Sequence, residues 1–165
     1  MFIDNTLSTG KFRMAYIITG LAAIGSFVCI YFKVSTVQTI CIIGSIFAAI
    51  HFLLLLLLNP SYFSIDDESD PIVIKRFGAY PLFRGYHAFN VRKKQLYKYT
   101  ISKSLFGLRK TLVITVRGLN KQRELEEFTY PKFNISTLPK DDIVLLEKLL
   151  NKYINENLAR MSPKK

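Results

Sequence analysis

The residues of this chain with the clearest chemical potential are cationic. Between Pro71 and Arg123 there are 13 Lys or Arg residues and no acidic residue. Beside an anionic bilayer, each basic residue contributes about 1 kcal/mol of attraction. The candidate contact residues are Arg92, Lys93, Lys94, Lys98, Lys103, Arg109 and Lys110. Three interpretations stay open: contact with anionic phospholipid headgroups, contact with an acidic protein partner, and a solvated surface that only marks the cytoplasmic side.

Patterns for catalysis, nucleotide binding and metal binding are missing from the sequence. His87 falls in an expected strand without a nearby nucleophile, and no glycine-rich phosphate loop occurs. The acidic cluster at residues 66–70 lacks the glycine turn and distal glutamate of a calcium loop. Basic residues also occur in nucleic-acid binders, but no motif of those proteins accompanies them here. We therefore expect a non-catalytic protein without metal or cofactor, for which nucleic acid is an unlikely partner.

Two apolar runs precede the basic segment. Residues 14–32 and 37–58 hold 19 and 22 residues, and neither run contains a charged side chain. A helix rises about 1.5 Å per residue, so each run can span the hydrocarbon of a bilayer. The first run is longer than a signal-peptide core and lacks a cleavage motif. Because four residues separate the runs, we expect a transmembrane hairpin with both chain termini on one side.

The positive charges near these runs predict an orientation. Lys11 and Arg13 precede the first run, Lys33 alone lies between the runs, and the segment after the second is basic. Lys and Arg accumulate on the cytoplasmic side of membrane proteins. We therefore expect residues 1–13 to be a cytoplasmic flank, both termini to be cytoplasmic, and the protein to be integral to the cytoplasmic (inner) membrane.

Small residues recur along one stripe of each apolar run, where they let helix backbones approach closely. The candidate packing residues are Ala15, Thr19, Ala22 and Ser26 in the first run, and Cys41, Gly44, Ser45 and Ala48 in the second. Two interpretations stay open: packing within the hairpin, or a seam with a second copy or another membrane protein. We expect Cys29 and Cys41 to be packing residues, and His51 to be neutral and hydrogen-bonded near Ser45 or Thr39 or to a partner helix.

The chain changes character at Asn59-Pro60. From Pro60 onward it holds 20 Lys or Arg and 11 Asp or Glu, a net charge of +9. Short stretches in which apolar and polar residues alternate predict strands. Apolar residues at helical spacing, with two aspartates in the first turn, predict a helix over residues 139–157 and a tail over 158–165. The expected strands are residues 62–65, 72–77, 84–91, 97–102, 112–117, 125–130 and 133–136.

This order of elements resembles the bacterial pleckstrin-homology-like (PH-like) domain. The resemblance covers residues 62–157 and is carried by residues 92–99 (RKKQLYKY), the strand at 112–116, and residues 134–138 leading into the helix. It implies a curved antiparallel sheet or barrel of about seven strands with a C-terminal helix, over residues 59–157. The chain is similar to bacterial membrane proteins in which two spans precede such a domain.

The resemblance supplies no site residues. It implies a non-catalytic binding or assembly module that contacts anionic lipid or a protein partner at the cytoplasmic face. The alternative is an accessory subunit of a larger membrane complex that acts through its transmembrane hairpin.

Overall fold

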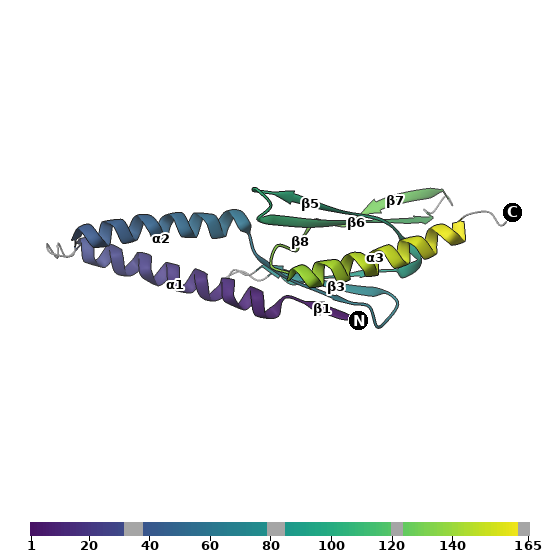
Figure 1. The fold of residues 1–165 in the computed structure, drawn as a ribbon, viewed down its shortest axis with the longest axis horizontal. Coiled ribbons are helices and arrows are strands. Elements are labelled where there is room, and N and C mark those ends of the chain that lie inside the picture. The colour runs from purple at the N-terminus through teal and green to yellow at the C-terminus, as the bar shows by residue number, and fades with distance from the viewer. Residues whose placement is uncertain (32–37, 79–84, 120–123, 162–165) are drawn as a thin grey trace.

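The computed structural model describes residues 1–31, 38–78, 85–119 and 124–161. A pair of long helices leads into two antiparallel sheets and a terminal helix (Figure 1). The helices are α1 (Thr6–Tyr31), α2 (Gln38–Leu58) and α3 (Lys140–Met161), with a short 3-10 helix η1 (Lys93–Gln95). The strands are β1 (Phe2–Asp4), β2 (Ser61–Asp66), β3 (Ile72–Gly78), β4 (His87–Val91), β5 (Leu96–Ser104), β6 (Arg109–Leu119), β7 (Leu125–Thr129) and β8 (Phe133–Asn134).

The helices α1 and α2 form the expected hairpin. The most apolar 18-residue windows of the two helices have mean hydropathies of 1.9 and 2.7, and both helices are long and apolar enough to cross a membrane. Only 11% of the most apolar window of α1 and 6% of that of α2 is buried. Tyr16 Oη donates a hydrogen bond of 2.8 Å to Leu55 O across the pair. The hairpin therefore exposes most of its apolar surface, unlike the core helices of a soluble domain.

The amino terminus belongs to the folded domain, which differs from the flank expected at residues 1–13. β1 pairs with β2, placing Ile3 opposite Ile65. Helix α1 then begins at Thr6, well before the apolar run, and Thr6 Oγ1 donates to Asp4 Oδ2 at 3.0 Å. A strand of three residues is too short to show a period of two. Strand β1 and helix α3, the first and last described elements, thus both lie on the domain side of the helix pair (Figure 1).

Two sheets face each other across the domain. The first has the order β1-β2-β3-β4, and the second has β5-β6-β7 with β8 also paired to β6. Helix α3 lies across the space between them and packs against β5 (Figure 1). The predicted antiparallel fold with a C-terminal helix is confirmed, but the described strands do not close into a barrel. Helix α3 also continues to Met161, past the predicted helix end at residue 157.

The predicted strands recur with shifted ends. The expected strand at 84–91 begins at His87 in the described part of the chain. Residue 84 lies outside the described residues.

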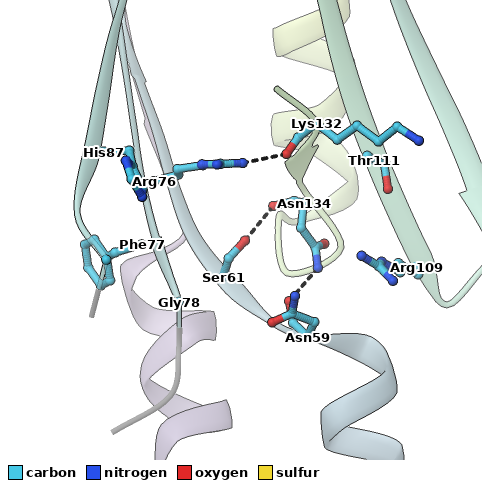
Figure 2. A pocket seen from close by; sticks show the side chains of 11 residues that line it. Asn59, Ser61, Arg76, Phe77, Gly78, His87, Arg109, Thr111, Lys132 and Asn134 are labelled. Carbon is cyan, nitrogen blue, oxygen red and sulfur yellow. Dashed lines mark hydrogen bonds between the residues drawn. The ribbon is translucent and has the colours of Figure 1, made fainter. Parts of the chain in front are cut away.

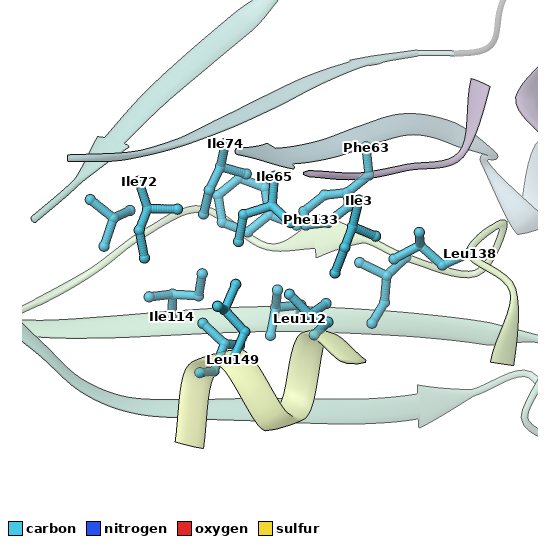
Figure 3. Close-up of a cluster of buried hydrophobic side chains, with 14 of the residues drawn as sticks. Ile3, Phe63, Ile65, Ile72, Ile74, Leu112, Ile114, Phe133, Leu138 and Leu149 are labelled. Atoms are coloured by element: carbon cyan, nitrogen blue, oxygen red, sulfur yellow. The ribbon is translucent and has the colours of Figure 1, made fainter. Parts of the chain in front are cut away.

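The core fills the space between the sheets because alternate strand residues point inward. Phe63 and Ile65 of β2 face Leu112 and Ile114 of β6, with Leu149 of α3 beside them (Figure 3). Each of these strand residues has no exposed surface. The inward-facing residues of the strands and the apolar residues of α3 thus pack in one cluster, as the sequence predicts.

Two asparagines attach the helix pair to the domain. The buried Asn5, just before α1, accepts a hydrogen bond from Phe63 N (2.8 Å) and donates to Ser61 O (2.9 Å) and Thr137 Oγ1. Asn134 Nδ2 donates to the last carbonyl of α2, Leu58 O, at 2.9 Å, and to Asn59 O at 2.6 Å. Every one of these bonds joins segments more than fifty residues apart. The helices are therefore fixed to the sheets.

We predict that Asn5→Ala destabilises the domain. The substitution leaves Phe63 N without its acceptor and Ser61 O without this donor in a buried place, which costs about 2–3 kcal/mol. The melting temperature of the full chain in detergent micelles, followed by circular dichroism, should fall clearly. The matched control is Asn90→Ala, because Asn90 is exposed on β4. Equal melting temperatures for the two variants would contradict the role of Asn5.

Candidate anion-binding cleft at the helix end of the domain

A cleft of about 270 Å³ opens between the two sheets at the end of the domain from which α2 extends (Figure 2). Asn59, the first residue after α2, forms part of its wall. We call it the helix-end cleft. It is lined by Asn59, Ser61, Arg76, Phe77, Gly78, Gly85, His87, Arg109, Thr111, Lys132 and Asn134.

The helix-end cleft has a cationic lining. Arg76, Arg109 and Lys132 carry positive charge, and none of the eleven described residues around the cleft is acidic. His87, Ser61 and Thr111 add further polar groups. Neighbouring cations without a counter-ion repel one another, so this arrangement favours an anion. The cleft thus has the composition of a phosphate or carboxylate site.

Arg76 bridges the two sheets at the cleft. Its Nη1 atom donates a hydrogen bond of 2.8 Å to Lys132 O, just before β8 (Figure 2). The guanidinium carbon also lies 5.4 Å from the ring centre of Phe89 and 5.8 Å from that of Phe133. These contacts hold the planar group in one place. A fixed guanidinium loses little freedom when it binds an oxyanion.

Arg109 lies at the start of β6, beside Asn134 (Figure 2). Its Nε atom is buried and has no hydrogen-bond partner in the described part of the chain, a property shared by Arg13 Nε in α1. The position of Arg109 is set by its neighbour, because Lys110 N donates to Ser136 Oγ at 2.8 Å. A buried donor without an acceptor is costly. An oxyanion in the helix-end cleft would supply the missing acceptor.

The structure divides the predicted cationic residues between the two ends of the domain. Lys103, Arg109 and Lys110 surround the β5–β6 turn at the helix end. Arg92, Lys93 and Lys94 lie at η1, before β5 begins. β5 has nine residues, so about 30 Å separates the two groups. Lys98 is exposed near the middle of β5.

Lys93 lies at the end of the domain opposite the helix pair, which we call the far end. Its charge is used in contacts within the fold. Its Nζ atom lies 3.0 Å from Asp67 Oδ1, and Tyr153 Oη donates to the same carboxylate at 2.7 Å. Asn157 of α3 donates to Lys93 O at 2.7 Å. The acidic cluster at residues 66–70 is therefore the expected turn between β2 and β3, and it pairs with the basic segment. Lys93 joins this turn to α3.

The surroundings raise the pKa of both ionisable partners of Asp67. Burial alone would lower the pKa of Lys93, but hydrogen bonds with Asp67 and Tyr153 and the charge of Asp67 outweigh it. Burial raises the pKa of Tyr153, and the hydrogen bond to Asp67 adds to the effect, against an opposite contribution from Lys93. Both groups thus hold their protons more tightly in the folded chain than in the unfolded one.

Some of the small residues predicted to pack in the apolar helices are buried within the chain. Thr19, Cys41 and Ala48 are buried. A Cβ atom at Gly44 would lie 3.6 Å from Ser26 Oγ of the facing helix. The remaining predicted packing residues are half-buried Ala15 and Ser45 and exposed Ala22. Ser45 Oγ donates to Cys41 O at 2.8 Å, so its hydroxyl hydrogen is not available to the exposed His51.

Sequence reasoning missed most of the helix-end cleft. Arg109 was among its candidates, and His87 was expected as a surface residue of a strand, which it is, since it is exposed on β4. Arg76 and Lys132 were not candidates, because their proximity depends on the pairing of distant strands. Among the described residues, no group of three or more His, Cys, Asp or Glu could hold a metal ion.

No protein-family model, curated protein or solved structure matches the chain. Its function is therefore inferred from its own geometry.

We predict that the Lys93–Asp67–Tyr153 cluster stabilises the domain and weakens in alkali. With folded pKa values above the unfolded ones, the folded chain binds more protons at high pH, so stability is full below about pH 10 and falls as the pH rises further. Tyr153→Phe should cost about 1 kcal/mol at pH 8 through the lost hydrogen bond. It should also make the loss of stability in alkali less steep.

Urea unfolding of the full chain in micelles at several pH values measures both effects. The control is Tyr86→Phe, since Tyr86 is exposed and directly precedes β4. If Tyr153→Phe and Tyr86→Phe show the same stability and the same pH dependence, the cluster does not stabilise the fold.

Proposed function

We propose that this chain is a membrane-anchored, non-catalytic module that binds the phosphate-bearing headgroup of an anionic lipid in the helix-end cleft. In this proposal α1 and α2 span the cytoplasmic membrane, and the domain lies at its cytoplasmic face with both termini. The observation that carries the proposal is the position of three cations and an unpaired buried donor beside the end of an apolar helix.

The helices support the membrane part of the proposal. Only 11% and 6% of their most apolar windows is buried, and exposing so much apolar surface to water would be unfavourable. The domain then follows α2 directly: Leu58 ends the helix, and Ser61 begins β2. Lipid headgroups begin where the hydrocarbon ends. The helix-end cleft therefore lies at headgroup level when the apolar part of α2 is in the bilayer.

The chemistry of the lining supports phosphate as the bound group. Guanidinium groups present several N–H donors in one plane and match the oxygens of a phosphate. Arg76 and Arg109 come from opposite sheets and both line the cleft. One phosphate between them would neutralise charge on both sheets and accept from Arg109 Nε. Zwitterionic headgroups carry a balancing cation, so an anionic lipid fits this lining better.

The position of the cations favours the cleft over the densest part of the basic segment. Arg92, Lys93 and Lys94 stand about 30 Å from the helix end, and Lys93 already has Asp67 as its counter-ion. Asn5 and Asn134 fix the domain on the helices, so it cannot rotate freely to bring η1 to the bilayer. Arg109 is the better placed of the predicted residues.

The PH-like assignment remains part of this proposal. Two facing antiparallel sheets and a C-terminal helix that fills the space between them support it. The open arrangement of the described strands differs from a closed barrel. An opening between the sheets at the helix end is also what gives an anion access to Arg76 and Arg109.

We predict that Arg109→Gln weakens binding of anionic lipid about tenfold or more, because a charge-assisted hydrogen bond contributes about 1.5–3 kcal/mol. The full chain in uncharged detergent is titrated with short-chain phosphatidylglycerol, and native mass spectrometry counts bound lipid. Phosphatidylcholine should bind more weakly. Glycerol phosphate forms a separate arm, because binding of this free phosphate without a preference for the lipid would point to a soluble ligand.

The matched control is Arg92→Gln, which removes the same charge from an exposed position at the far end. Arg92→Gln should bind lipid as the unmodified chain does. An equal loss in both variants would show a general charge effect, and a loss only in Arg92→Gln would place binding at η1. Either result would overturn the assignment to the cleft.

A further inference from the structure

The turn between β5 and β6, residues 105–108, is apolar and projects from the domain. Its sequence is Leu-Phe-Gly-Leu. Phe106 is fully exposed, and Leu108 is 63% exposed. Loops of this kind are usually polar, since nothing in a short turn repays the exposure of large apolar side chains to water. This turn makes no contribution to the core cluster.

The backbone of the turn is also unfavourable for its residues. Leu105, Phe106 and Gly107 have φ angles of 52°, 55° and 86°. Glycine adopts this left-handed region readily, but a bulky side chain rarely does. Hydrogen bonds from Gly107 N to Ser104 O and from Leu108 N to Leu105 O, both 3.1 Å, hold the shape. Strain of this kind concentrates where a side chain must be presented outward for a purpose.

The turn lies at the same end of the domain as α2. Arg109, the residue after the turn, lines the helix-end cleft together with Asn59, the residue after α2. β6 runs from there toward the far end, so the turn projects the opposite way, beside the end of α2 (Figure 1). Phe106 is the most exposed residue of the turn, and Leu54, Leu56 and Leu57 are exposed on the last turns of α2.

Cations surround the apolar turn. Lys103 precedes it, and Arg109 and Lys110 follow it. An apolar turn flanked by basic residues suits the interface of a bilayer. The apolar side chains can enter the acyl region while the ammonium and guanidinium groups stay among the phosphates. A protein partner could cover an apolar tip as well. The lipid is favoured because the exposed apolar turn and the exposed apolar residues of α2 lie at the same end of the domain.

We infer that residues 105–108 insert into the interface of the same bilayer that α1 and α2 cross. This inference rests on the proposed membrane span. The contact would attach the domain to the bilayer in addition to α1 and α2. It would hold β6, and with it Arg109, against the headgroups. Phe106 would be the main anchor, with Leu108 beside it.

A single introduced tryptophan tests this insertion, because the chain contains none of its own. Phe106→Trp, Phe47→Trp and Phe128→Trp place the reporter in the turn, in α2 and on β7, and all three positions are exposed in the isolated chain. The full chain is reconstituted in vesicles of phosphatidylcholine with or without bromine on the acyl chains. This neutral lipid makes the result independent of anion binding in the cleft.

The expected result is that bromine quenches Phe106→Trp and Phe47→Trp several-fold more than Phe128→Trp. Emission of Phe106→Trp should also lie at shorter wavelength than that of Phe128→Trp, as for aromatic side chains at a membrane interface. If only Phe47→Trp is quenched, the insertion of the turn is overturned while the membrane span stands. If Phe47→Trp is not quenched either, the insertion of the turn and the membrane span are both overturned.

Discussion

The attachment of the helix pair to the sheets is the constraint on which the rest of the structure depends. Asn5 and Asn134 sit where α1 and α2 meet the domain, and each joins segments that are distant in sequence. An asparagine side chain both donates and accepts, so one residue can satisfy a backbone N–H and a carbonyl together. Asn5 does this in a buried site, where an unmade bond would be expensive. The domain therefore keeps one orientation relative to the helices.

A fixed orientation gives each surface of the domain a set distance from the apolar helices. If the domain hung on a flexible linker, any basic face could turn toward a bilayer, and the cation count would be the main guide to binding. Here Leu58 and Ser61 are separated by only two residues, and both neighbouring carbonyls are held by Asn134. Position along the long axis then decides which cations can act near lipid. The helix-end cleft and the β5–β6 turn share the favourable end.

Local patterns in the sequence predicted the elements, and distant pairing determined the site. Alternation within a few residues is enough to find β3 or β6, and a long apolar run is enough to find α2. β1 was missed because three residues cannot display a period. The lining of the cleft combines Asn59, Arg76, Arg109 and Lys132, which are brought together by strand pairing and by the packing of the two sheets against each other. No local pattern contains that information.

Charge density in the sequence is for the same reason an incomplete guide to the electrostatics of the folded chain. The run from Arg92 to Lys94 is the densest, yet folding brings Asp67 to Lys93 and cancels its charge. Screening adds to this, since the Debye length is about 8 Å at physiological ionic strength and η1 stands about 30 Å from the helix end. Charges there have almost no effect on an anion at the other end. Arg109 is one cation among many in the sequence, but its buried Nε atom has no partner among the described residues, and of the cations that line the helix-end cleft it therefore has most to gain from an anion.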